Sequence, residues 1–207
     1  MTHPLDAGAA ESMFHRPGLH RALRDSVIPV LRTYPFVKVW CAGCSTGEQA
    51  YAIAITLAEE GLRERAGVYA TDVNEVALGR AREGVYPADA FSEADYLAAG
   101  GKHSLTDYFT GHGDRAAMVP WLRKWITFAQ HGLLTDASFN EFQLILCQKV
   151  MTDFDDDLCR RAFRLFHESL CLFGVLIVDD EESIGLHPYR GGYEELDGRE
   201  KVYRRVE

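Results

Sequence analysis

The sequence lacks the features of a secreted or membrane-inserted protein. No apolar run approaches the roughly 20 residues that a membrane-spanning helix needs. The first twelve residues, MTHPLDAGAAES, contain neither a charged start nor an apolar stretch, so we expect no secretory signal and no membrane insertion. Five cysteines are an odd number, and no second pair follows the lone CxxC of Cys41 and Cys44. Reduced thiols in a cytoplasmic protein are therefore favoured over a redox or metal pair.

Positive charge is also scarce. The chain has 22 lysines and arginines against 31 aspartates and glutamates, a formal net charge of -9. That balance argues against a broad nucleic-acid-binding surface, so we expect no nucleic-acid partner. Arg160, Arg161 and Arg164 could form a local basic patch, although such residues are more typical of the solvated face of a helix.

Two acidic runs lack the histidine spacing that would accompany a hydrolytic metal site. The first comprises Asp153 and 155–157, and its last three acids favour the start of a helix. The second, 179–182, follows an apolar strand and is typical of a solvated loop, although it could border a pocket. We therefore expect no bound metal, and metal-dependent hydrolysis is the least favoured function.

The first half of the chain alternates between strand and helix patterns. A helical pattern over 17–31 is expected to kink at Pro29, and it belongs to an N-terminal lead-in and helix that we assign to residues 1–33. The remaining residues, 34–207, are expected to form one domain. Within it the patterns predict, in order, a strand at 36–40, a helix at 49–62, a strand at 67–71 and a helix from the N-cap Asn74 to Gly84.

The second half is less regular before it returns to the same alternation. Strands that alternate with helices predict an α/β fold, a doubly wound, mostly parallel sheet with one antiparallel strand near the C-terminus. Between residues 85 and 120 only short helices are predicted, at 93–98 and 105–109. Beyond them the patterns predict strands at 125–129, 142–147 and 175–178, a helix over 156–172 that stops near Gly174, and a closing antiparallel strand at 201–206.

The first strand, loop and helix carry the most informative chemistry. A small-residue loop follows the first strand, and its glycines Gly43 and Gly47 let a ligand approach the backbone closely. The next helix offers free N–H groups and the positive end of its dipole. Asp72 ends the second strand about 25 residues further on, where an acid can accept hydrogen bonds from ribose hydroxyls. The combination predicts an adenosine-containing ligand. Of the scattered histidines at positions 20, 103, 112, 131, 167 and 187, at most His131 is expected near it.

Longer runs of the sequence match a known pattern. They are VWCAGCSTGEQAYAIAITLAEEG, YATDVNEVALGRAREGVYP, FQLILCQKVMTDFDDDL, RLFHESLCLFGVL and YEELDGREKVYRRV. These runs resemble the chemotaxis-receptor methyltransferases of the CheR type, from about Glu11 to Val206 and in the family's order. The helical domain that usually precedes the catalytic domain in that family is not found here, apart from the helix near the start of the chain.

The resemblance implies a function and a set of binding residues. The fold would be that of class I S-adenosylmethionine-dependent methyltransferases, with S-adenosylmethionine as cofactor and a receptor or other signalling protein as methyl acceptor or partner. No catalytic side chain is assigned. The implied cofactor-binding residues are Gly43, Gly47 and Glu48 in the loop, Asp72 at the ribose, His15 or Arg16 at the cofactor carboxylate, Gly132 and Leu133 after the third strand, and Gln148 and Lys149 after the fourth.

Five positions depart from the family's pattern. His15 stands for an arginine, Gly132 for an asparagine, Gln148 and Lys149 for an arginine–asparagine pair, and Asp153 for an aromatic hydroxyl. Methyl transfer depends mainly on in-line positioning and needs no nucleophilic side chain. We therefore expect a protein-glutamate O-methyltransferase that acts in chemotaxis-like signalling. The alternative is a catalytically degenerate domain that acts as a cofactor-binding sensor or protein-interaction module.

Overall fold

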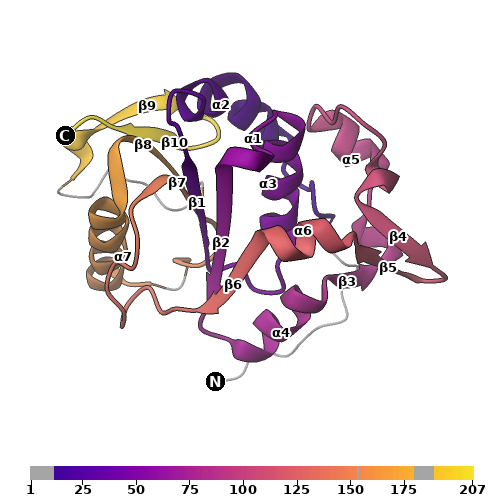
Figure 1. The fold of residues 1–207 in the computed structure, drawn as a ribbon. Helices are drawn as coiled ribbons and strands as arrows, with labels where there is room; N and C mark the ends of the chain where they lie inside the picture. Colours follow the sequence, from indigo (N-terminus) through magenta and orange to yellow (C-terminus); the bar gives the residue numbers. More distant parts are fainter. Residues whose placement is uncertain (1–11, 153, 180–188) are drawn as a thin grey trace.

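A computed structural model describes residues 12–152, 154–179 and 189–207 of the chain. Its central sheet has seven strands, which are, from edge to edge, β6 (Ile126–Gln130), β2 (Ala66–Asp72), β1 (Val37–Ala42), β7 (Phe142–Cys147), β8 (Leu170–Ile177), β10 (Val202–Arg205) and β9 (Tyr193–Asp197) (Figure 1). β10 is antiparallel to both neighbours and the other pairs are parallel. The predicted doubly wound, mostly parallel sheet with one antiparallel strand is confirmed.

Helices cover both faces of this sheet (Figure 1). Successive side chains of a strand alternate between faces, so Val39 and Cys41 of β1 join one hydrophobic cluster while Trp40 and Ala42 join another. α7 (Asp156–Ser169) packs in the cluster of Trp40. The helical elements of the opposite face are α1 (Pro17–Ala22), the π-helical turn η1 (Leu23–Val27), α2 (Ile28–Leu31), α3 (Glu48–Glu59), α4 (Glu75–Glu83) and α6 (Pro120–Trp125).

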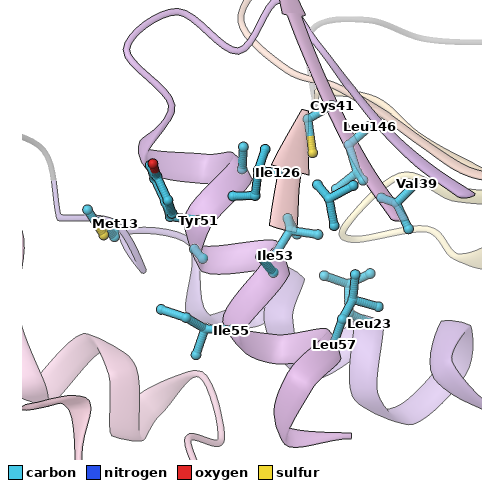
Figure 2. Packing of buried hydrophobic residues seen from close by; sticks show 14 of the residues in the cluster. Met13, Leu23, Val39, Cys41, Tyr51, Ile53, Ile55, Leu57, Ile126 and Leu146 are labelled. Carbon is cyan, nitrogen blue, oxygen red and sulfur yellow. The ribbon is translucent and has the colours of Figure 1, made fainter. Parts of the chain in front are cut away.

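α3 lies at the centre of the larger cluster. Every residue from Ala50 to Leu57 is buried, as is typical of a helix that is hydrophobic on all sides. Figure 2 shows Tyr51, Ile53, Ile55 and Leu57 surrounded by side chains from β1, β6, β7 and η1. Each fully buried aliphatic side chain of this kind contributes about 1.5–3 kcal/mol to folding. This packing fixes α3, and therefore the loop before it, against the carboxyl ends of the strands.

The N-terminal helical segment packs into the same cluster. The interruption predicted around Pro29 is present as the π-helical turn η1, which immediately precedes the helix that contains Pro29. Proline has no N–H to donate to a carbonyl one turn back, so a regular α-helical ladder cannot continue through it. Leu23, Val27 and Ile28 are at most 1% exposed. The domain boundary at residues 33 and 34 stays a prediction.

The structure corrects the predicted boundary between the long helix and its following strand. The helix was expected over 156–172, but α7 ends at Ser169, and β8 begins at Leu170. Leu170 pairs with Phe142 and Val175 pairs with Leu144, so β8 contains extra residues that bulge out of the ladder. Phe173 has a φ of 64° in this bulge and is 52% exposed. The helix therefore ends before Leu170, because pairing and burial of this residue in the sheet outweigh the helical pattern of the sequence.

Residues 85–118 hold a second sheet that the patterns did not predict. The antiparallel strands β3 (Val85–Pro87), β5 (Arg115–Met118) and β4 (Phe109–His112) lie in that order. Strands of three or four residues are too short to show a clear alternation. α5 (Glu93–Ala98) confirms the first predicted helix, whereas the second is only the 3-10 turn η4 (Leu105–Asp107). Further single turns are η2 (Arg63–Arg65), η3 (Ala88–Ala90) and η6 (Arg190–Gly192).

The segment between α4 and β6, which contains the second sheet, is an insertion in the α/β domain, and a buried carboxylate joins it to the rest of the domain. The side chain of Glu59, at the end of α3, is 0% exposed and pairs with Arg24 of η1 at 2.5 Å. It also accepts hydrogen bonds from the hydroxyls of Tyr96 and Tyr108 and from the backbone N–H of Lys102. Burial alone would raise the pKa of Glu59, but the hydrogen bonds from Tyr96, Arg24 and Tyr108 outweigh it and lower the pKa below its usual value. In the described parts of the chain, no helix is both long and apolar enough to cross a membrane.

Candidate functional site

Two adjoining cavities lie beyond the carboxyl ends of β1, β2, β6 and β7. The polar cavity, of about 420 Å³, is lined by residues 43–46 of the loop after β1, but not by Gly47, together with Ser12, His15, Glu48, Gln49, Gln148 and Lys149. The apolar cavity, of about 380 Å³, is lined by Asp72, Val73, His131, Leu133, Val150 and Phe154 among others. Gly43 lines both. In open α/β sheets this is the position at which ligands bind.

The glycines of the loop are required by its geometry. Gly43 has a φ of 68°, and a Cβ on it would collide with the side chain of Val150. Gly47 has a φ of 93°, and a Cβ on it would lie 2.8 Å from Cβ of Ala81 in α4. Ser45 between them also has a positive φ, 47°. Positive φ values at residues other than glycine are strained and concentrate at binding sites.

Asp72 is oriented by backbone donors on either side. One carboxylate oxygen accepts from the N–H of Ser45 at 2.8 Å, and the other accepts from the N–H of Asn74 at 2.9 Å. A carboxylate has about four acceptor positions, so each oxygen can still accept from a ligand. The side chain is therefore held at the rim of the apolar cavity with acceptor capacity left for a pair of hydroxyls.

Glu48 is the first residue of α3 and lines the polar cavity. The hydroxyl of Thr46 lies 2.9 and 2.7 Å from its two carboxylate oxygens and can donate to one of them. An acid in the first turn of a helix also interacts favourably with the helix dipole. Glu48 is thus a fixed negative charge that faces the cavity.

Gln148 contributes an unsatisfied donor to the polar cavity. It is 7% exposed, and its carbonyl oxygen accepts a hydrogen bond from the amide of Gln49. Its Nε2 is buried and has no hydrogen-bond partner among the described residues. An unsatisfied buried donor costs about 1–3 kcal/mol, so this amide favours a ligand that brings an acceptor. The next residue, Lys149, has a φ of 59° and lines the same cavity.

Of the two N-terminal candidates, only His15 reaches the polar cavity. Its Nδ1 lies 2.9 Å from the carbonyl oxygen of Ser12. Arg16 is not among the residues that line either cavity, and its guanidinium instead pairs with Asp179 at 2.8 Å and with Glu200 at 3.3 Å. The structure therefore does not bring Arg16 to the candidate site as a direct ligand-binding side chain.

The segment after β6 forms the far wall of the apolar cavity. The N–H of Gly132 donates to the carboxylate of Asp136 at 2.8 Å. A Cβ on Gly132 would collide with the hydroxyl of Thr135, so a larger side chain here requires that the hydroxyl of Thr135 move. Leu133 is 8% exposed and lines the cavity. His131 also lines it, and the backbone N–H of His131 donates to the backbone carbonyl of Asp72 at 3.1 Å.

Sequence reasoning missed several lining residues. Val73 is 65% exposed, which is unusual for valine, and it follows directly after Asp72. Gln49 follows Glu48 and reaches the opposite wall by contacting Gln148. Position next to a predicted site residue was the available signal for both. Val150 follows Lys149 and had the same signal, whereas Phe154 had none, because only the folded chain brings it to Leu133.

The acidic runs and cysteines provide no metal site within the described residues, where no group of three or more His, Cys, Asp or Glu is arranged to hold an ion. Asp155 caps α7 by accepting from the N–H of Leu158 at 2.9 Å, which confirms the helix-start interpretation. Asp153 and residues 180–182 lie outside the described residues. None of the five cysteines forms a disulfide.

We expect Cys41 and Cys44 to resist alkylation by iodoacetamide in the native protein at about pH 8. Burial raises the pKa of both thiols, that of Cys44 to about 12, and the charge of Asp72 acts in the same direction on Cys44. Only about one Cys44 thiol in ten thousand is then ionised, and the thiolate is the reactive form. Peptide mass spectrometry should find the partly exposed Cys159 labelled first, with urea-unfolded protein as the control. Rapid labelling of native Cys44 would contradict this.

Comparison with known proteins decides the family. Residues 11–195 match the family described as CheR methyltransferase, SAM binding domain. The chain belongs to the CheR family. This confirms the predicted resemblance and the predicted cofactor, S-adenosylmethionine, because the matched domain is the one that binds it.

Two relatives are similar to this chain in sequence, and one solved structure matches it in part. Cher3 of Pseudomonas putida, named as a methyltransferase, is 44% identical over 195 residues, which are 93% of this chain and 71% of the relative. The chemotaxis protein methyltransferase of Listeria monocytogenes is 32% identical over 175 residues, 84% of this chain and 64% of the relative. The glycopeptide N-methyltransferase MtfA complexed with sinefungin matches 84% of this chain and 52% of its own, with 15% identity and a TM-score of 0.49.

The residues that depart from the CheR pattern and are described in the structure all line the polar or the apolar cavity. Gln148, where the resemblance implies an arginine, carries the unsatisfied amide, and Gly132, where it implies an asparagine, lies with Thr135 close to the position of a Cβ. His15 lines the polar cavity. Lys149 lines the same cavity, and Asp153 lies outside the described residues.

Proposed function

We propose that this chain is an S-adenosylmethionine-dependent methyltransferase that forms methyl esters on glutamate side chains of a receptor or another signalling protein. One observation carries the proposal: a polar and an apolar cavity meet at Gly43, beside the oriented carboxylate of Asp72. That arrangement fits a ligand with an amino-acid end, a ribose and an aromatic base. A cytoplasmic setting belongs to the same proposal, and the absence of a disulfide among the five cysteines supports it.

The lining residues suggest how the cofactor would be held. The apolar cavity, with Val73 and Leu133, suits the adenine ring, and Asp72 can accept from both ribose hydroxyls. In the polar cavity the unsatisfied amide of Gln148 suits the carboxylate of the methionine end. The carboxylate of Glu48 suits its ammonium group.

The protein's task in this reaction is to position two reactants. When bound, S-adenosylmethionine supplies a sulfonium-activated methyl group whose carbon bonds to an acceptor carboxylate oxygen as the sulfur–carbon bond breaks. A glutamate carboxylate is already a nucleophile when ionised, so the chain need not provide a general base. Gln148, Glu48 and Asp72 would fix the cofactor's orientation, and none of them has to react.

Calorimetric titration with S-adenosylmethionine and with S-adenosylhomocysteine tests the cofactor site. We expect dissociation constants of about 1–100 μM, because the polar groups that match the cofactor are already in place. No heat up to about millimolar concentrations of either compound would contradict the proposal. Methyl transfer is then measured with labelled cofactor and cytoplasmic receptor fragments, and a methyl ester is identified by release of the label in base.

The variant that combines Gln148→Arg and Lys149→Asn separates the proposal from a non-catalytic relative. Family membership favours an active enzyme, so we expect the native chain to transfer methyl groups without these changes. Activity that appears only in the restored variant, while the native protein still binds the cofactor, would instead indicate a sensor or interaction module.

A further inference from the structure

The N-terminal segment, defined as residues 12–16, forms one wall of the polar cavity. Ser12 and His15 line it. Met13 and Phe14 are 2% and 1% exposed, and the N–H of Met13 donates to the carbonyl of Ala90 at 3.0 Å. One side of the segment is therefore fastened to the hydrophobic core and to the turn after β3.

Arg16 fastens the other side of the segment to the far end of the chain. Its guanidinium donates to Asp179, just beyond β8, at 2.8 Å, and to Glu200, in the turn between β9 and β10, at 3.3 Å. The three side chains are 17%, 20% and 13% exposed, so these ion pairs are partly shielded from water. Gly18 permits the approach, because a Cβ there would collide with the carboxylate of Glu200.

Asp179 also holds the opposite wall of the cavity. Its second carboxylate oxygen accepts from the backbone N–H of Lys149 at 3.2 Å. Lys149 has a φ of 59°, a conformation that non-glycine residues keep only when their surroundings enforce it. Lys149 follows Gln148, which lines the polar cavity and carries the unsatisfied amide. One carboxylate thus connects the N-terminal segment with the strained turn after β7.

We propose that Arg16 is a positioning residue for the cofactor cavity, which it shapes by holding Asp179 between the two walls. The proposal rests on the proposed function, since the cavity is taken to bind S-adenosylmethionine. Arginine suits this role because its planar fork can donate to two carboxylates at once, whereas lysine is a point charge. His15 and Gln148 contact the ligand in this scheme, and Arg16 acts only through Asp179.

Replacement of Arg16 by glutamine tests the proposal, with Arg199→Gln as the matched control. Arg199 is exposed on the same turn as Glu200, and its side chain makes no contact among the described interactions. For Arg16→Gln we expect the dissociation constant for S-adenosylhomocysteine and the KM for S-adenosylmethionine to rise about tenfold, with kcat within about twofold. Arg16→Lys should fall between the variant and the native protein, and Arg199→Gln should match the native protein.

A thermodynamic cycle connects the effect to Asp179. If Arg16 acts through that carboxylate, the double variant Arg16→Gln with Asp179→Asn should bind S-adenosylhomocysteine no more weakly than the Asp179→Asn variant alone. Additive losses would overturn the proposal, as would native affinity in Arg16→Gln.

Hydrogen exchange separates this proposal from the proposed function, because it needs no ligand. The amides of His15 and Lys149 should exchange about tenfold faster in Arg16→Gln than in the native and Arg199→Gln proteins. Faster exchange in a protein that fails to bind any cofactor would support the positioning role while the proposed function fails. Unchanged exchange at both amides would overturn the positioning role itself.

Discussion

The Asp72→Asn variant is expected to bind S-adenosylhomocysteine about a hundredfold more weakly than the native protein. Both carboxylate oxygens of Asp72 accept backbone N–H groups, from Ser45 and from Asn74. An asparagine has one acceptor oxygen, so its amide group would face one of these N–H donors. Hydrogen bonds to a charged group contribute about 1.5–3 kcal/mol, and a hundredfold loss corresponds to about 2.7 kcal/mol.

Asp89→Asn is the matched control for this variant. Asp89 is exposed on the turn after β3 and makes no side-chain contact among the described interactions. Calorimetric titration of the three proteins provides the measurement. Equal affinities for Asp72→Asn and the native protein would mean that Asp72 does not face the ribose, and the assignment of the apolar cavity to the adenosine end would then fail.

The second large effect is expected at the amino end of α3. Gly47→Ala should lower the free energy of unfolding by about 3 kcal/mol, because the new methyl group combines an unfavourable φ with a close contact to Ala81. Gly61, just beyond the other end of α3, has a φ of 74° and nothing within 4 Å of a Cβ. Gly61→Ala should therefore show the cost of φ alone, about 1 kcal/mol.

Urea unfolding followed by circular dichroism measures both glycine variants. The comparison isolates the steric contact, since the two glycines flank one helix and share a left-handed conformation. If Gly47→Ala were no more destabilising than Gly61→Ala, α4 would have to shift away from the loop at little cost. The close packing of the loop on α4 would then not explain the glycine at position 47.

The sequence alone predicted those structural features that depend only on residues close to one another in the chain. Gly43, Gly47 and Asp72 follow from the alternation of strand, loop and helix, and Glu48 follows from the family resemblance. The structure brings Gly43, Glu48 and Asp72 to the adjoining cavities, whereas Gly47 lines neither. The cap at Asn74 and the stop at Gly84 were likewise readable, because each depends on the residues within one turn.

Long-range contacts account for what the sequence did not predict. Arg16 could be placed near the cofactor carboxylate by its position beside His15, yet its partners Asp179 and Glu200 are 163 and 184 residues away. The start of β8 depends on pairing between Leu170 and Phe142, which a helical pattern does not encode. The three short strands of the second sheet stabilise one another, and each alone carries too little signal.

The buried carboxylate of Glu59 limits which segments from related proteins can replace the insertion between α4 and β6. The insertion between α4 and β6 supplies two tyrosine hydroxyls and a backbone N–H to this carboxylate, while Arg24 arrives from the N-terminal helical segment. A chimera that received a foreign insertion without these donors would keep a buried charge with only part of its compensation, at a cost of several kcal/mol. Substitutions at the exposed positions of the insertion therefore leave Glu59 unaffected. The donors of the insertion that contact Glu59 must be kept together with Arg24 and the end of α3.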